Sequence, residues 1–94
     1  MSAYCARVSG EIDCASAPAY AAILAAAAHD HDGDVLVDVA AVTFADSTMV
    51  RVTLEARARL AESGRRLRVV NASAALVRLF EITGVDDVLE RDPV

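Results

Sequence analysis

The 94-residue sequence contains only two cysteines, no long apolar run and no surplus of basic residues. Without a secretory context, Cys5 and Cys14 are expected to remain thiols that act as small hydrophobic side chains, and a redox-sensitive pair stays open. The longest apolar stretch, residues 15–28, is rich in alanine, contains Pro18 and is too short to span a bilayer. The N-terminus has no basic segment followed by a long apolar core. These absences predict a cytoplasmic protein that does not insert into a membrane.

Basic residues are outnumbered, which argues against nucleic acid as a direct partner. The formal net charge is −5 at pH 7, whereas binding to phosphates requires a clustered basic face. An acidic balance favours solubility or a basic protein partner. Arg57, Arg65, Arg66 and Arg68 offer a basic rim for an acidic partner, and a solvated surface is the simpler interpretation of these four.

Catalytic and cofactor motifs are missing as well. The sequence has no Cys/His nucleophile pair, no glycine-rich phosphate-binding loop and no paired catalytic carboxylates. Residues 29–34, HDHDGD, include metal-ligating residue types, but their spacing matches neither an EF-hand nor a zinc motif. We therefore expect no enzymatic activity, no cofactor and no metal site, and we interpret this tract as a solvated loop.

What the sequence does contain is an alternation of strand-like and helix-like segments. Strands are predicted at residues 4–8, 35–39 and 67–70, with a short strand or helical turn at 85–89. Helices are predicted between them, at about residues 16–28, 48–63 and 73–83. Strands that alternate with helices pair in parallel through right-handed crossovers. The chain is thus predicted to be one α/β domain, residues 1–94, with a mostly parallel sheet of about four strands packed with helices.

The second strand leads into Asp46, Ser47 and Thr48, at the start of the second helix. Its β-branched run at residues 35–39 predicts a strand covered on both faces, and an apolar stripe at helical spacing follows from Met49. At such a junction a side-chain oxygen caps free backbone N–H groups, and Ser47 is predicted to do so. A phosphate added here would meet the positive end of the helix dipole. Ser47 is therefore a predicted helix cap and a candidate phosphate site.

Three loops of the predicted domain are expected to share one edge of the sheet. Loops that leave the C-terminal ends of parallel strands gather at the same edge, where partners bind in open α/β sheets. Asp13, Ser47 and the turn at residues 71–73 should lie there, and Ser73 should cap the third helix. Asp13 and Asp46 also have ordinary interpretations as acceptors in a turn or a helix start. The tract at residues 29–34 should lie at the opposite end.

Three short motifs along the chain carry a family resemblance. They are SGEID at Ser9–Asp13, VAAVTFADST at Val39–Thr48 and EITGV at Glu81–Val85. In this order they resemble the STAS domains of bacterial anti-sigma factor antagonists, which typically read S-G-E-L-D, then F-x-D-S-[ST]-G after a hydrophobic strand, then L-x-x-T-G-L-D. The motifs cover nearly the whole chain, and the D-S-T element has a strand before it and a helix after it. The resemblance implies a STAS-type fold.

The resemblance also implies a function. The unmodified form of an anti-sigma factor antagonist binds an anti-sigma factor serine kinase and so releases a sigma factor. The kinase reverses this by phosphorylating the serine after the aspartate, which is Ser47 here, with Thr48 as the second choice. Partner-binding residues are predicted to be Asp13, Asp46, Ser47, Thr48, Met49, Arg51 and Ser73. In this role the protein is ligand and substrate rather than enzyme.

The sequence departs from the family pattern in two regions. Met49 stands where relatives carry glycine, and Arg51 where they carry a small residue. These departures keep open an alternative function, a non-phosphorylated STAS scaffold in a stress-signalling complex or a small subunit bound to a lipid-transport ABC ATPase. Only nine residues precede Gly10, so the antiparallel strand that usually begins such domains is expected to be shortened or absent. An uncovered sheet edge would invite a partner, and we expect a monomer or weak dimer.

Overall fold

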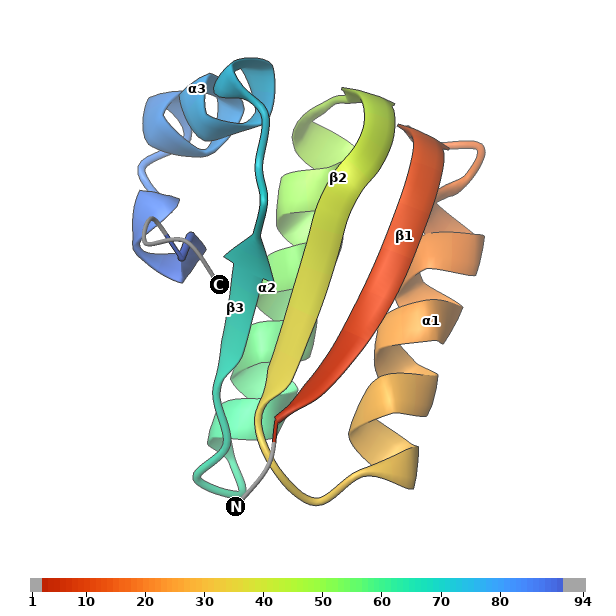
Figure 1. Ribbon diagram of the computed structural model, residues 1–94, viewed down its shortest axis with the longest axis vertical. Coiled ribbons are helices and arrows are strands. Elements are labelled where there is room, and N and C mark those ends of the chain that lie inside the picture. Colours follow the sequence, from red (N-terminus) through yellow and green to blue (C-terminus); the bar gives the residue numbers. More distant parts are fainter. Residues whose placement is uncertain (1–2, 91–94) are drawn as a thin grey trace.

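The strands of the computed structural model, which describes residues 3–90, form one parallel sheet in the order β1-β2-β3 (Figure 1). The elements in chain order are β1 (Tyr4–Ile12), α1 (Ala17–Asp30), β2 (Val35–Ala45), α2 (Ser47–Ala61), β3 (Leu67–Val70), α3 (Ala74–Ile82) and a short 3-10 helix, η1 (Asp86–Val88). The outermost parts of the predicted domain, residues 1–2 and 91–94, lie outside the described residues. The predicted α/β class with a parallel sheet is confirmed.

Helices α1 and α2 cover the same face of the sheet. In the order β1-β2-β3 both right-handed crossovers step in one direction, so both helices are carried to one side. Figure 1 shows them behind the strands. Val35, Val37 and Val39 are buried on this side, whereas the two side chains between them are only partly buried. The prediction that residues 35–39 are covered on both faces is therefore wrong, because neither crossover helix reaches the other face.

The core lies between this face of the sheet and the two helices. Ala6, Val8 and Ile12 of β1 are buried and alternate with exposed or partly exposed neighbours, as the two-residue period of a strand requires. Other elements contribute the buried residues Tyr20, Leu24, Met49, Val50, Val52, Leu60, Val69, Leu76 and Phe80. Each large side chain removed from water contributes about 1.5–3 kcal/mol to the hydrophobic term.

The sheet has three strands, fewer than the four that we predicted. Residues 86–88 form η1, so the helical-turn alternative for residues 85–89 is the one that the structure shows. Leu89 makes one isolated parallel bridge to Val69, and the N–H of Glu90 donates to the Val69 carbonyl at 2.7 Å. Because β3 is only four residues long, it offers little backbone for a fourth strand to pair with.

Strands β1 and β2 both extend further than predicted. The first strand was predicted to end at residue 8, but β1 passes through Gly10, which has a φ of 77°, and continues to Ile12. β2 continues to Ala45, and this residue pairs with Ile12. Two register shifts in the β1–β2 pairing absorb the extra residues of β2. The two strands consequently end level with each other.

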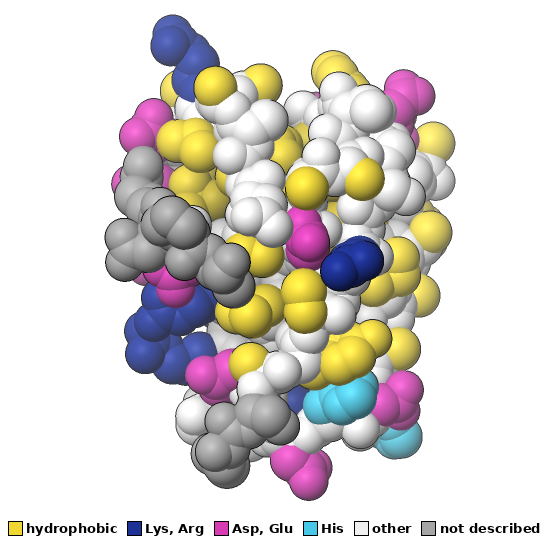
Figure 2. Space-filling model, in the orientation of Figure 1, with side chains coloured by type: hydrophobic (Ala, Val, Ile, Leu, Met, Phe, Trp, Pro, Cys, Tyr) yellow, Lys and Arg dark blue, Asp and Glu magenta, His cyan; other side chains and the backbone are white. Residues whose placement is uncertain are grey.

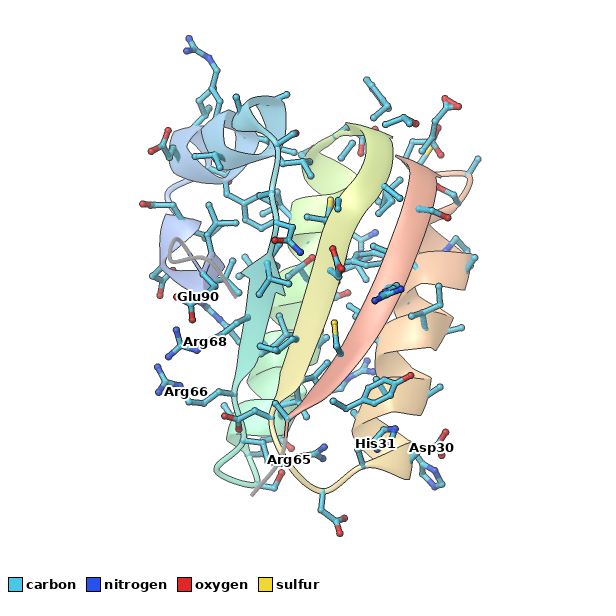
Figure 3. The ribbon with its side chains drawn as sticks, viewed as in Figure 1. Asp30, His31, Arg65, Arg66, Arg68 and Glu90 are labelled. Atoms are coloured by element: carbon cyan, nitrogen blue, oxygen red, sulfur yellow. The ribbon has the colours of Figure 1, made fainter. Side chains whose placement is uncertain are left out.

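Arg65 fastens the loop at the other end of the sheet (Figure 3). Its guanidinium donates to the carbonyl of Gly33 at 2.8 Å, to that of Ala28 at 3.0 Å and to that of His31. A guanidinium carries five N–H donors in a fixed arrangement, which suits it to hold several carbonyls together. Arg65 thus serves the fold and is not available to a partner as part of a basic rim.

Two more of the arginines that we considered for a basic rim are paired within the fold. Arg57 contacts the carboxylate of Asp87 at 3.2 Å, and Arg68 contacts that of Glu90 at 3.1 Å. Arg66 points away from the molecule in Figure 3. The solvated interpretation of this group fits the structure better than a concentrated basic surface does.

A buried chain of hydrogen bonds ties α1 to the first turn of α2. The hydroxyl of Thr53 donates to the Met49 carbonyl at 2.7 Å, and the Tyr20 hydroxyl lies 2.7 Å from the Thr53 oxygen. Because the Thr53 proton is directed at Met49, the Tyr20 hydroxyl is the donor to Thr53. All three residues are buried. Burial raises the pKa of Tyr20 to about 12.

We expect Tyr20 to reduce the stability of the protein at high pH. The phenol has a pKa of 10.0 in the absence of the fold and about 12 within it. The free energy of unfolding should therefore be unaffected by this group below pH 10 and should fall as the pH rises from 10 to 12. Tyr20→Phe should remove this fall and cost about 1 kcal/mol at neutral pH through the lost hydrogen bond. Denaturant unfolding at a series of pH values measures both effects.

The matched control is Tyr4→Phe, because Tyr4 is 38% exposed. This variant should keep the alkaline loss of stability. An unchanged alkaline profile in Tyr20→Phe would contradict the assignment.

Candidate functional site

Asp46 is the residue that caps α2. Its backbone is extended, with φ −123° and ψ −170°, and its carboxylate accepts a hydrogen bond from the N–H of Thr48 at 2.9 Å. Its carbonyl accepts from the N–H of Met49 at 3.0 Å. A carboxylate at this position satisfies a free amide and complements the positive end of the helix dipole. The prediction that Ser47 is the cap is therefore wrong, because the helix begins one residue earlier than such a cap requires.

Ser47 is the first residue of α2, and it is exposed. Its hydroxyl makes no hydrogen bond within residues 3–90. Backbone N–H groups in the first turn of a helix have no intrahelical partner, so the surroundings of this hydroxyl favour negative charge. Thr48 is only partly exposed. Of the two hydroxyls, that of Ser47 is the more accessible to another protein.

Asp13 organises the turn that follows β1. Its carboxylate accepts from the N–H of Ala15 at 3.0 Å and from that of Ser16 at 3.1 Å. The Ser16 hydroxyl in turn accepts from the N–H of Asp13 at 2.9 Å and donates to the Glu11 carbonyl at 2.7 Å. The backbone N–H of Ser16 is the main cause that lowers the pKa of Asp13 below its ordinary value. The stability that these bonds contribute is lost as the pH falls through that lowered pKa.

The pairing of β1 with β2 brings this turn next to the start of α2. Ile12 pairs with Ala45, and the N–H of Asp46 donates to the Ile12 carbonyl at 3.3 Å. Asp13 and Asp46 therefore follow two residues that lie side by side. Figure 1 places both loops at the same end of the sheet. The parallel topology predicted this juxtaposition of Asp13 with Ser47.

Ser73 reaches the same end of the molecule by a different route. β3 ends at Val70, which pairs with Asp38 and lies well short of the end of β2. Asn71 leaves β3 with a φ of 62°, and its side-chain amide donates to the Asp38 carboxylate at 3.2 Å. The chain then continues past β3 to α3, which lies at the same end as the start of α2 (Figure 1). Ser73 caps α3 as predicted, by accepting from the N–H of Leu76 at 3.2 Å.

Met49 and Arg51, the two departures from the family pattern, lie on opposite sides of α2. Met49 has no exposed surface and packs in the core. The expectation that its side chain contacts a partner is therefore wrong, because the third residue of this helix faces the sheet. Arg51 is exposed and pairs with Glu55, four residues later, at 3.3 Å. Only Arg51 presents its side chain to the surroundings.

Phe44 is a surface residue that sequence reasoning did not assign to the site. Its side chain is 53% exposed, and it pairs with Glu11 on the face of the sheet that carries no helix. It lies two residues before Asp46, at the end of β2. The register shifts between β1 and β2 decide which side chains of β2 face outward, and no sequence pattern reveals them. Phe44 supplies the candidate site with an apolar contact beside its acidic groups.

Residues 29–34 lie at the far end of the sheet from Ser47, as predicted. His29 and Asp30 belong to the last turn of α1 and hydrogen-bond to each other at 3.1 Å. The ring of His31 stacks on Tyr4 with the ring centroids 3.7 Å apart. Within residues 3–90, no group of three His, Cys, Asp or Glu side chains is arranged to hold a metal ion.

Cys5 lies on β1 and Cys14 in the turn after it, and both are free and exposed. The described part of the chain has no helix with the length and apolar character needed to cross a membrane. Cys14 follows Asp13 in the turn that borders the start of α2, whereas Cys5 lies near the opposite end of β1.

Comparisons with known proteins identify relatives of this chain. A family model described as "Mlab, STAS domain" matches residues 5–90. The chain is 32% identical over 84 residues to the anti-sigma-B factor antagonist of Bacillus subtilis (strain 168), across 89% of this chain and 76% of the relative. It is 29% identical over 86 residues to the anti-sigma-B factor antagonist of Staphylococcus aureus (strain NCTC 8325), across 92% of this chain and 80% of the relative.

A solved structure provides a match in three dimensions. The anti-sigma factor antagonist SpoIIAA in its unphosphorylated form superimposes with a TM-score of 0.79. The match covers 94% of this chain and 77% of that chain, at 19% sequence identity. At this identity the likeness concerns the fold, which the two proteins share.

Replacement of the cap should separate Asp46 from Ser47. We expect Asp46→Ala to lower the free energy of unfolding by about 1 kcal/mol, because the N–H of Thr48 loses its acceptor. Asp46→Asn should retain most of that stability, since an amide oxygen also caps a helix. Ser47→Ala is the matched control and should change stability by less than about 0.5 kcal/mol. Denaturant unfolding distinguishes these outcomes, and a loss in Ser47→Ala equal to that in Asp46→Ala would show that the serine caps the helix after all.

Proposed function

This protein belongs to the STAS-domain family, and we propose that it acts as an anti-sigma factor antagonist. In this proposal the unmodified form binds an anti-sigma factor serine kinase, which releases a sigma factor. Phosphorylation of Ser47 by the same kinase ends the binding. The protein is then ligand and substrate rather than catalyst, and it works in the cytoplasm, where sigma factors meet RNA polymerase.

The observation that carries the proposal is the state of Ser47. Its hydroxyl is exposed at the first position of α2 and is free of hydrogen bonds within residues 3–90. Because Asp46 performs the capping, modification of Ser47 removes no bond that holds the helix. The names of the relatives from Bacillus subtilis and Staphylococcus aureus support the role of antagonist.

The electrostatics at this end of the sheet give the modification a local effect. A phosphoserine adds about −1.5 to −2 charges near pH 7. The helix dipole favours this charge, so the domain should remain folded. The same charge would stand beside the carboxylate of Asp46 and close to the turn of Asp13, where a partner would meet crowding and like-charge repulsion. Phosphorylation would thus act on the interface and not on the fold.

Arg51 and Phe44 lie on the surface near Ser47 and complete the proposed partner surface. Arg51 is exposed one turn along α2, and Phe44 offers an apolar side chain on the sheet side. A partner that covers Ser47 would combine an apolar contact with charged contacts of both signs. Thr48 and Ser73 are peripheral in this proposal, because Thr48 is only partly exposed and the Ser73 hydroxyl is engaged in capping α3.

Mapping of the phosphate tests the switch directly. The protein is incubated with ATP and a candidate anti-sigma factor serine kinase from the same organism, and the modified residue is identified by mass spectrometry. We expect one phosphate, on Ser47, in the wild-type protein and in Thr48→Ala, and none in Ser47→Ala. Phosphate on Thr48 alone, or on neither residue with a kinase that phosphorylates another antagonist, would exclude the proposed site.

Binding measurements test the consequence of the charge. Ser47→Asp should weaken binding to the kinase by about tenfold or more, since a single misplaced charge at an interface costs upwards of about 1.4 kcal/mol. The asparagine of Ser47→Asn has nearly the same size as the aspartate of Ser47→Asp but carries no charge. Ser47→Asn should therefore bind the kinase as tightly as Ser47→Ala does. Isothermal titration calorimetry gives the affinities. Equal affinities of all three variants, together with tight binding to a transporter ATPase, would favour the non-phosphorylated scaffold.

A further inference from the structure

β1 is an edge strand whose outer side has no partner within residues 3–90. The N–H of Tyr4 donates to the carbonyl of Asp34 at 2.9 Å, and the carbonyl of Ile12 accepts from the N–H of Asp46 at 3.3 Å. Both residues have even numbers, so the even-numbered residues of β1 direct their backbone N–H and C=O groups toward β2. Successive residues of a strand alternate in this respect. The residues whose backbone groups face the open edge are therefore Cys5, Arg7, Ser9 and Glu11. Such a row of groups is a template for another strand.

The side chains of these four residues lie on the face of the sheet that carries no helix, and all four are exposed. Arg7 has 87% of its side chain exposed and approaches Asp38 no closer than 3.9 Å. The Glu11 carboxylate has no partner in the described part of the chain. Arg7 and Glu11 are thus two opposite charges on either side of Ser9, and neither is committed to a close contact.

This charge pattern is complementary to itself. When two copies of β1 lie antiparallel with Ser9 opposite Ser9, Arg7 of each copy faces Glu11 of the other. Opposite charges in directly facing positions stabilise a strand pair, whereas like charges destabilise it. A register centred on Arg7 would place the two arginines opposite each other. Charge therefore selects the register centred on Ser9.

The helix beside this edge supplies a second, apolar surface. All exposed residues of α1 before His29 are uncharged, namely Pro18, Ala19, Ala21, Ala22, Ile23, Ala25 and Ala26. Ile23 is 40% exposed, and with Ala26 it lines a shallow hollow between α1 and β1 that Tyr4 and Asp30 border. Figure 2, which faces the open side of the sheet, shows hydrophobic side chains along this edge of the molecule together with a basic group and, near its two ends, acidic groups. A helix that exposes so little charge is expected to face another protein surface.

We propose that two copies of this protein form a symmetric dimer by antiparallel pairing of their β1 edges, centred on Ser9. The two three-stranded sheets then become one continuous sheet. A two-fold axis perpendicular to that sheet keeps the helices of both copies on one side, so α1 of one copy meets α1 of the other and covers Ile23. The dimer is weak, because the strand contact is short and the helix contact consists mainly of alanine.

A register-specific disulfide tests the pairing. In a Cys5→Ser, Cys14→Ser background, Ser9→Cys places two thiols opposite each other, at a Cα separation of about 5.5 Å that a disulfide can bridge. The matched control is Cys14→Ser alone, which keeps Arg7 and Glu11 and carries only Cys5: its two thiols would be displaced by eight residues, roughly 26 Å, which is beyond reach. Under mild oxidation we expect a covalent dimer from Ser9→Cys at several-fold higher yield than from this control. Equal yields, or no dimer from Ser9→Cys, would overturn the register.

A charge exchange tests the same register without a covalent bond. Arg7→Glu should raise the dissociation constant of the dimer about tenfold, because two attractive pairs become repulsive. Arg7→Glu combined with Glu11→Arg should restore it to within about threefold of the wild-type value. Sedimentation equilibrium measures the constants, and denaturant unfolding verifies that each variant is folded.

A wild-type protein that remains monomeric at high concentration would overturn the dimer and leave the β1 edge to a strand of another protein. Failure of the double variant to recover would overturn the charge pairing. Kinase-dependent phosphorylation of Ser47 should be the same in Arg7→Glu and the wild-type protein, so this result separates the dimer from the proposed switch.

Discussion

The parallel pairing of β1 with the full length of β2 is the constraint on which the rest of the structure depends. Parallel neighbours require crossover connections, and the strand order β1-β2-β3 sends both connecting helices to one face. That face becomes the core. The same pairing places Ile12 and Ala45, the last residues of β1 and β2, side by side. The turn that contains Asp13 therefore lies next to the first turn of α2. The pairing also leaves the other face and the β1 edge without cover in the described structure.

Capping by Asp46 and exposure of Ser47 are two parts of one arrangement. A helix start needs an acceptor for its free N–H groups, and the aspartate supplies it. The next residue can then carry a hydroxyl that no structural role occupies. On the proposed function, a charge added to Ser47 would therefore remove no hydrogen bond that holds the helix, and its main effect would fall on the interface.

Much of this arrangement was predictable from periodicity and turn residues. Alternating strand and helix patterns indicated the parallel α/β sheet, and Ser73 was recognised as a cap from its place before an apolar stripe. The errors have physical causes. A shift of one residue in where α2 begins decides whether Asp46 or Ser47 is the cap. The same starting point places Met49 on the buried side of the helix. The outward position of Phe44 and the passage of β1 through Gly10 depend on register shifts between strands, which are tertiary properties. Arg65 looked like a surface charge because its carbonyl partners are remote in sequence.

The hydrogen bonds from Tyr20 through Thr53 to Met49 support the first turn of α2, where Ser47, the proposed phosphorylation site, lies. Met49 is two residues from Ser47, and its carbonyl is held by a side chain that is itself held by α1. If Ser47 is modified as we propose, the kinase must recognise a serine at the corner of a folded domain and not in an extended peptide. On that proposal, substitutions in the buried contact between α1 and α2 would change the rate of modification without altering the surface around Ser47.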